Sequence, residues 1–283
     1  MYYADLEARR LKNVLCLLTY NSKREIADLW PTLLLHKHPL HIVIVDNAST
    51  DGTAEMFQQS NIPFTRNTAN NYYSAGINQC LRKALEADPE WVFIVNPDTM
   101  LTEDWDERIV GHFTQQKEVG IVGCRLTTPD GKLVHAGGEV GKPKAVYWPT
   151  SYQLGDSEWE VVQPDVVAVS SFHHSLKDSP EPRETAWVTF AVTALRADML
   201  RQIGLLDEEY LLYCSDANLC VRAWASGWEV WYNPLASFQH KVSANVRAAG
   251  SDVHEICKAD LRRGALEESK WQRSLEDRPR SKM

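Results

Sequence analysis

The chain has 283 residues, of which 44% are hydrophobic, so it is long and apolar enough to form a sizeable core and is not a disordered chain. Its 30 Lys and Arg against 38 Asp and Glu give a formal charge of −8, which offers no electrostatic reason to expect a nucleic-acid partner. Six dispersed cysteines, with no signal peptide and no apolar run of about 18 residues, predict a cytoplasmic protein with free thiols and no transmembrane span.

The first half of the chain alternates between apolar runs and helical segments. Unbroken apolar runs predict buried strands at Val14–Leu18, Ile42–Val45, Trp91–Val95 and Val119–Cys124. Helices are predicted at about Lys23–His36, Ser74–Glu86 and Asp104–Gln116. Strand, polar loop and helix repeated in series imply a parallel sheet with right-handed crossovers.

The second half is less regular. From Gly137 to Pro182 we expect a long irregular segment, with one strand within Val161–Ser170. Beyond it the sequence predicts a strand at Ala186–Val192, helices at Ala197–Ile203 and Ala217–Ala225, a strand at Trp228–Tyr232, and a charged helical tail from about Val253.

The strand Trp91–Val95 runs directly into the polar turn Asn96-Pro97-Asp98-Thr99. Open parallel sheets bind ligands outside the carboxyl ends of their strands, where Asp98 would lie. A carboxylate there suits Mg²⁺ or Mn²⁺, which would in turn hold phosphates. The alternative is an ordinary turn, since all four residue types favour turns. Neither G-x-G-x-x-G nor a P-loop follows any strand, so a Rossmann dinucleotide site and a P-loop are both unexpected.

Six short stretches in a fixed order carry a resemblance. They are Leu18–Ser22, Val45–Thr53, Ala75–Asn78, Asn96–Thr99, Trp187–Thr189, and Gly204–Glu208 leading to Ser215–Arg222. The chain resembles glycosyltransferase family 2, the inverting GT-A enzymes, and within it the rhamnosyltransferase-like branch, from about Val14 to His240. The resemblance implies an α/β GT-A fold with a mostly parallel central sheet flanked by helices. It also implies one domain over residues 1–283, with a nucleotide-sugar half (about 13–125), an acceptor half (about 126–250) and a helical tail (251–283).

The resemblance implies a binding site for a nucleoside-diphosphate sugar. Its residues are Thr19, Tyr20, Asn21, Asp46, Gly76, Asn78, Asn96 and Asp98. Asp46 would accept hydrogen bonds from the base or ribose. Its alternative role is in a turn with Ser49, Thr50 and Asp51 that caps the next helix, and both roles are compatible.

The metal ligands implied by the resemblance are Asp98 and His240, for Mg²⁺ or Mn²⁺. Asn96 stands where the family often has a first acid, so it contributes no charge. As an isolated histidine after a strand, His240 has a structural alternative.

Asp216 matches the presumed general base of the family, and Ser215 and Trp187 match positions on the acceptor side. The start of the following helix offers Ser215 or Asp216 an alternative role as N-cap, and core packing is the alternative for Trp187. Ser215 and Asn218 stand where the family usually has acids. With fewer carboxylates nearby, we expect Asp216 to have less reason for a raised pKa.

The expected activity is inverting transfer of a sugar from a UDP- or dTDP-linked donor to a hydroxyl of a glycan or lipid-linked acceptor. The alternatives are a glycan- or nucleotide-binding GT-A protein without turnover and a sugar nucleotidyltransferase. The latter would need a glycine-rich basic loop after the first strand, and Thr19–Ser22 is neither. The acceptor would meet the 137–182 region. The basic C-terminal segment offers a possible peripheral membrane contact, with a solvated helix as the favoured alternative.

Overall fold

The computed structural model describes residues 13–147, 151–154, 158–161, 166–174, 177–241, 253–267, 271 and 273. Its first half contains β1 (Asn13–Thr19), α1 (Lys23–Leu33), β2 (Leu40–Asp46), α2 (Thr53–Gln59), β3 (Thr65–Arg66), α3 (Tyr72–Glu86), β4 (Trp91–Val95), β5 (Thr99–Met100), α4 (Trp105–Val110) and β6 (Val119–Thr127). The second half contains β7 (Leu133–His135), β8 (Gly138–Tyr147), β9 (Ser151–Leu154), β10 (Glu158–Val161), β11 (Val166–His174), β12 (Arg183–Glu184), β13 (Val192–Arg196), α5 (Ala197–Ile203), α6 (Ser215–Ala225), β14 (Glu229–His240) and α8 (Val253–Leu266).

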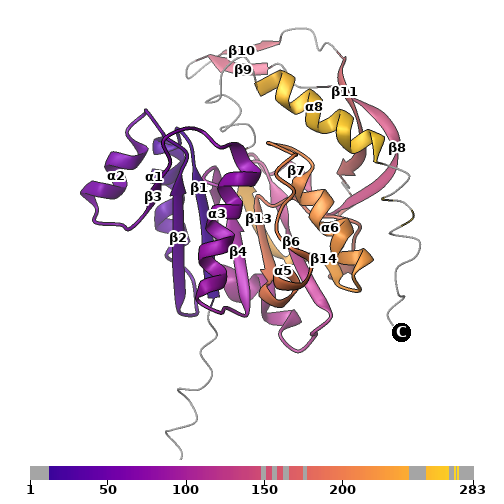
Figure 1. The fold of residues 1–283 in the computed structure, drawn as a ribbon, viewed down its shortest axis with the longest axis horizontal. Coiled ribbons are helices and arrows are strands. Elements are labelled where there is room, and N and C mark those ends of the chain that lie inside the picture. Colours follow the sequence, from indigo (N-terminus) through magenta and orange to yellow (C-terminus); the bar gives the residue numbers. More distant parts are fainter. Residues whose placement is uncertain are drawn as a thin grey trace, which may run out of the picture.

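One mixed sheet forms the centre of the molecule, with the strand order β12-β14-β6-β13-β4-β1-β2-β3 (Figure 1). The strands β4, β1, β2 and β3 run parallel, and β14 runs parallel to β6. β13 lies antiparallel between β4 and β6. The α/β fold class with a central sheet flanked by helices is confirmed, although the sheet is mixed. Its parallel strands end at one edge, hereafter the carboxyl edge.

Apolar side chains that point alternately to the two faces of the central strands form a hydrophobic core on each side of the sheet. In β1, Val14 and Cys16 pack with α3, α5 and α6, whereas Leu15 and Leu17 pack with α1, α2 and α4. Successive side chains of a strand point to opposite faces, so a strand covered on both sides needs an unbroken apolar run. This double burial explains why β1, β2 and β4 were predictable.

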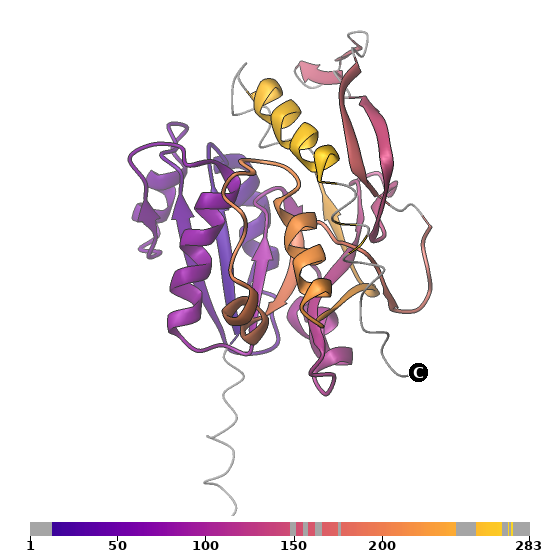
Figure 2. The same cartoon turned by 45° about the vertical axis from the view of Figure 1, so that its right-hand side comes forward.

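The prediction of an irregular 137–182 segment is wrong where the structure describes it. β8 pairs with β11 and β9 pairs with β10, in two antiparallel ribbons that stand apart from the central sheet (Figures 1 and 2). The strand predicted within Val161–Ser170 corresponds to β11, which begins and ends closer to the C-terminus, at Val166 and His174. A two-stranded ribbon outside the main sheet does not need the long apolar run that marks a central strand.

Two further expectations differ from the structure. The strand predicted at Ala186–Val192 begins only at Val192, because it is the following residues that pair with β4 and β6. The tail is not simply a solvated helix: Cys257, Leu261 and Trp271 are buried. α8 lies above the carboxyl edge and beside β11, as both views show (Figures 1 and 2). Among the described helices, none combines the length and apolarity needed to cross a membrane.

We expect Gly123→Ala to destabilise the fold. A Cβ added there would lie 2.5 Å from Cγ1 of Val188, which is fully buried. Val188 is β-branched and cannot move aside easily, so overpacking of about 1–3 kcal/mol should lower the melting temperature. Gly120→Ala is the matched comparison, because its nearest atom is the flexible Met199 sulfur. Equal melting temperatures for the wild type and Gly123→Ala would contradict this packing.

Candidate functional site

Polar loops converge at the carboxyl edge, and several hold a non-glycine residue in the left-handed region. Asn21, Ala48 and Tyr72 have φ values of 49°, 62° and 60°, and Cys214 has 65°. Asn21 and Ala48 follow β1 and β2, Tyr72 is the first residue of α3, and Cys214 precedes α6. Each such residue costs about 1–3 kcal/mol, and strain of this kind gathers at functional sites. Backbone strain therefore occurs at the edge predicted to bind ligands, and it also occurs at Asn61, Asp88 and Asp104 elsewhere in the chain.

Asp46 ends β2 opposite Thr19, the last residue of β1, and is fully buried. Its Oδ1 accepts a hydrogen bond from the Thr19 hydroxyl at 3.0 Å, and its Oδ2 accepts one from the Ser49 amide at 3.0 Å. The Arg66 guanidinium lies 3.8 Å away. Asn21 links the loop after β1 to the loop after β2, because its backbone amide donates to Ser49 Oγ. The predicted turn with Ser49, Thr50 and Asp51 is confirmed, and Asp51 Oδ1 accepts a hydrogen bond from the Thr53 amide at the start of α2. Base or ribose recognition by Thr19, Tyr20, Asn21 and Asp46 stays a prediction.

Asp98 and His240 lie side by side at this edge. β5 pairs antiparallel with the end of β14, which sets Thr99 opposite His240, and the Lys241 amide donates to the Asp98 carbonyl at 2.8 Å. His240 Nε2 is 3.3 Å from Asp98 Oδ1, and the Asp98 carboxylate is almost fully buried. His240 Nδ1 is buried and has no hydrogen-bond partner among the described residues. An oxygen ligand and a nitrogen ligand thus lie at the spacing of two neighbours around one cation.

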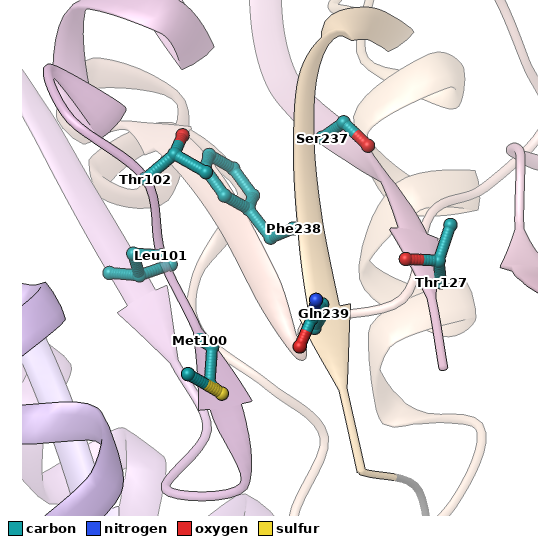
Figure 3. Close-up of a pocket in the computed structure, with 7 residues that line it drawn as sticks. All are labelled: Met100, Leu101, Thr102, Thr127, Ser237, Phe238 and Gln239. Atoms are coloured by element: carbon teal, nitrogen blue, oxygen red, sulfur yellow. The ribbon is translucent and has the colours of Figure 1, made fainter. Parts of the chain in front are cut away.

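A separate pocket of about 240 Å³ runs along β14 next to this pair (Figure 3). It is lined by Met100, Leu101, Thr102, Thr127, Ser237, Phe238 and Gln239. Ligand pockets typically hold about 300–1,000 Å³, so this one is too small for a whole nucleotide sugar. Gln239 pairs with Met100 on one side and with Thr127 on the other, so the pocket lies along the strand residues that directly precede His240.

Asp216 lies in the first turn of α6, half-buried. Burial of the carboxyl group raises its pKa to about 6, and hydrogen bonds from the Ala217 and Phe190 amides and the Thr189 hydroxyl offset part of that rise. The expectation that Asp216 has less reason for a raised pKa considered only repulsion between carboxylates, whereas desolvation supplies the shift. The N-cap of α6 is Cys214, without a side-chain cap, so neither Ser215 nor Asp216 is the predicted N-cap.

We expect Asp216→Asn to stabilise the folded protein near pH 8. The folded pKa lies above that of an unfolded aspartate, so the contribution of Asp216 to the free energy of unfolding decreases as pH rises from about 4 through 6. A neutral amide avoids this cost, and the net gain should be about 1 kcal/mol, because asparagine keeps only one acceptor oxygen. Thermal unfolding at pH 8 and pH 5 should show the gain shrinking at the lower pH; a loss of stability at pH 8 would contradict the raised pKa.

Two tyrosines, Tyr73 and Tyr213, lie within the influence of both Asp98 and Asp216, and neither was predicted from the sequence as a site residue. Burial raises the pKa of the Tyr73 and Tyr213 phenols well above their usual value, and the negative charges of Asp216 and Asp98 add to the rise for each. Because charges act on both rings from both carboxylates, Asp98 and Asp216 flank one region. The Tyr73 hydroxyl lies 3.4 Å from the Phe190 carbonyl, next to the amide that binds Asp216.

Other predicted site residues have contacts that hold the scaffold. A Cβ at Gly76 would lie 2.6 Å from Leu18, so this glycine allows α3 to approach β1 closely. Asn78 donates to the Leu206 carbonyl and to Glu208 and accepts from the Leu206 amide. Trp187 is 4% exposed and donates to the Glu139 carbonyl, which favours its packing role. Roles for these three residues in substrate binding stay predictions.

Asn96 and Ser215 each lie near one of the two acids in the sequence, Asn96 two residues before Asp98 and Ser215 directly before Asp216. The backbone amide of Asn96 donates to the Ala191 carbonyl at 2.7 Å, and the backbone carbonyl of Asn96 accepts a hydrogen bond from the Thr99 hydroxyl at 2.8 Å. This fixes the turn that presents Asp98. Ser215 is buried beside Asp216 at the start of α6. Their predicted contacts with donor and acceptor stay predictions.

Comparisons with known proteins identify the family. The family model described as Glycosyl transferase family 2 matches residues 15–162. The N-acetylglucosaminyl-diphospho-decaprenol L-rhamnosyltransferase of Mycobacterium tuberculosis is 23% identical over 225 residues, which cover 73% of this chain and 68% of that protein.

Two solved structures have the same fold. The mannosyltransferase PcManGT from Pyrobaculum calidifontis, in complex with GDP-Man and Mn²⁺, is 16% identical with a TM-score of 0.54, over 94% of this chain and 72% of that one. S. aureus TarS 1-349, in complex with UDP-GlcNAc, is 15% identical with a TM-score of 0.56, over 93% of this chain and 70% of that one. The chain belongs to glycosyl transferase family 2 and is a glycosyltransferase with the GT-A fold.

Proposed function

We propose that this glycosyltransferase moves a sugar, with inversion, from a nucleoside-diphosphate donor to a hydroxyl group of a glycan or lipid-linked acceptor. The observation that carries the proposal is the pair of separated acids at the carboxyl edge. Asp98 lies against His240, and Asp216 has a pKa raised to about 6. Asp98 would hold a cation that binds the departing diphosphate, and Asp216 would take the proton from the attacking hydroxyl.

The residues at Asp98 fit a hard divalent cation. Asp98 Oδ1 and His240 Nε2 would hold Mg²⁺ or Mn²⁺, and His240 Nδ1 is left to donate its proton to a water or another acceptor. No cluster of three or more ligating side chains occurs in the described part of the chain. Phosphate oxygens and water would therefore complete the coordination, as is common for Mg²⁺. A bound cation would stabilise the negative charge on the departing diphosphate.

Asp216 performs the proton transfer in this proposal. As the acceptor oxygen bonds to the anomeric carbon and the bond from that carbon to the diphosphate breaks, the hydroxyl proton passes to the Asp216 carboxylate. Thr189 and the amides of Phe190 and Ala217 orient the carboxylate. A pKa of about 6 leaves Asp216 ionised at neutral pH and more basic than an ordinary aspartate. No covalent intermediate with the protein is needed.

The donor and acceptor classes rest on the relatives. The rhamnosyltransferase of M. tuberculosis acts, by its name, on a sugar linked through diphosphate to decaprenol. TarS was solved with a UDP-sugar. We therefore propose a lipid-linked or glycan acceptor and a UDP-linked donor, with dTDP as the alternative nucleotide from the sequence resemblance. Contact of the protein with a membrane surface belongs to the same proposal.

A donor panel tests the proposal. Purified protein with Mg²⁺ or Mn²⁺ is incubated with UDP-, dTDP- and GDP-sugars, and free nucleoside diphosphate is measured with and without EDTA. We expect metal-dependent release from at least one donor. Donor binding without release from any of them would favour a binding protein. Pyrophosphate formation from a nucleoside triphosphate and a sugar phosphate would favour a nucleotidyltransferase.

A further inference from the structure

The segment that leads into Asp216 is held from two sides by other parts of the fold. On one side, the Leu211 carbonyl accepts hydrogen bonds from the Tyr73 amide at 2.9 Å and the Ser74 amide at 3.2 Å, at the start of α3. On the other side lies α8, whose Asp260 carboxylate faces the same backbone. Hydrogen bonds from α3 and α8 therefore fix the backbone of residues 211–213, directly before Cys214, which has a positive φ and lies two residues before Asp216.

Asp260 makes three hydrogen bonds with consecutive backbone amides. Its Oδ1 accepts from Leu211 at 3.1 Å, and its Oδ2 accepts from Leu212 at 2.7 Å and from Tyr213 at 2.9 Å. Asp260 is 3% exposed, and desolvation raises its pKa while the three amides oppose that rise. A buried carboxylate bonded to three amides is a strong and geometrically specific anchor.

Nearby contacts reinforce the docking of α8 on this loop. The Tyr210 hydroxyl donates to Glu267 at 3.1 Å, and the Arg263 guanidinium lies 5.5 Å from the centre of the Tyr210 ring. The Trp271 ring packs 6.5 Å from the same tyrosine. The loop before α6 thus has many of its contacts with a helix that lies 47 to 49 residues further along the chain.

We propose that Asp260 is a positioning residue: from α8 it fixes the 211–213 backbone so that Asp216 is presented to the acceptor in a closed, poorly hydrated place. The proposal rests on the proposed role of Asp216 as the base. The charge of Asp216 acts on Tyr73, Tyr213, Cys214 and Cys220, and the charges of Asp98, Asp260 and Arg222 act on members of the same group. Altering Asp260 would admit water to the loop and remove a nearby negative charge, and both changes lower the pKa of Asp216.

The test compares Asp260→Asn and Asp260→Ala with the wild type by two readouts. Hydrogen exchange of the full-length protein reports the Leu211–Tyr213 amides without needing activity, and these should exchange at least tenfold faster in both variants. The pH profile of kcat should keep its shape but move its acidic limb to lower pH, with a kcat at least tenfold smaller and a KM for donor within twofold. If Asp260→Ala does not fold, the milder Asp260→Asn, which keeps one acceptor oxygen, carries the test.

Glu255→Gln on the same helix is the matched control, because Glu255 is exposed and pairs with Lys258 of the same helix. It should leave exchange and pH profile unchanged. An unshifted acidic limb, or unchanged exchange at residues 211–213, would overturn the positioning role. Failure of the proposed function is separate, since it would appear as absence of transfer by the wild type while the exchange result still stands.

Discussion

Asp216→Asn should lower kcat for sugar transfer by at least ~100-fold, because general-base catalysis by a positioned carboxylate contributes about 10²–10⁴-fold. The amide cannot take the hydroxyl proton, whereas its shape and one acceptor oxygen remain for Thr189 and its neighbouring amides. Donor affinity, measured by calorimetry with the metal present, should stay within about twofold, since uniform binding is not altered.

The pH dependence of the transfer rate of the wild type is a second test of the role of Asp216. Transfer should decline below about pH 6 as the Asp216 carboxylate becomes protonated. Asp198→Asn is the control, because that carboxylate is exposed on α5 and pairs with Arg201 of the same helix. Full activity of Asp216→Asn, or a rate that does not fall through pH 6, would remove Asp216 from the base role.

Removal of the divalent cation should abolish transfer, and Asp98→Asn should reduce it strongly. The Asp98 carboxylate is the only charged ligand in the Asp98–His240 pair, and Asn96 is neutral. Loss of its charge should lower the metal affinity by at least ~10–100-fold, the range seen even when the hydrogen-bond partners of metal ligands are mutated. His240→Ala should have a smaller effect, because phosphate and water would still supply oxygen ligands.

Mn²⁺ binding in the presence of nucleoside diphosphate, followed by electron paramagnetic resonance, measures this independently of turnover. Asp88→Asn serves as the control, since Asp88 is exposed after α3 and pairs with Arg201 away from the carboxyl edge. Full activity in EDTA, or wild-type Mn²⁺ affinity in Asp98→Asn, would contradict the metal site.

Much of the first half of the fold was predictable because its strands are buried on both faces. Trp91–Val95 alternates between the two core clusters with no polar residue, and a short run of this kind is typical of a strand covered on both sides. β13 was misplaced because Ala186–Val192 is equally apolar, and only pairing with β4 and β6 decides where the strand begins. Of the ribbons β8–β11 and β9–β10, only part of β11 was predicted, because the pairing of such strands does not require a long apolar run.

The candidate site was predictable where residues follow strands directly, and not where it depends on distant packing. Asp98 and His240 were paired through resemblance, and the structure brings them within 3.3 Å. The raised pKa of Asp216 could not be predicted, because it depends on how closely Phe190 and Thr189 surround the carboxyl group. Asp260 lies in a charged stretch with no local pattern, and its contacts with residues 211–213 appear only when the chain folds.

The anomeric configuration of the product tests the central claim most directly. Proton NMR of the sugar first released from the active donor, with water as the acceptor and before mutarotation, reports whether a single displacement has occurred. The two-acid arrangement of Asp98 and Asp216 predicts the inverted anomer, formed only with Mg²⁺ or Mn²⁺ and lost in Asp216→Asn. Release with the configuration of the donor retained would contradict a single displacement assisted by Asp216.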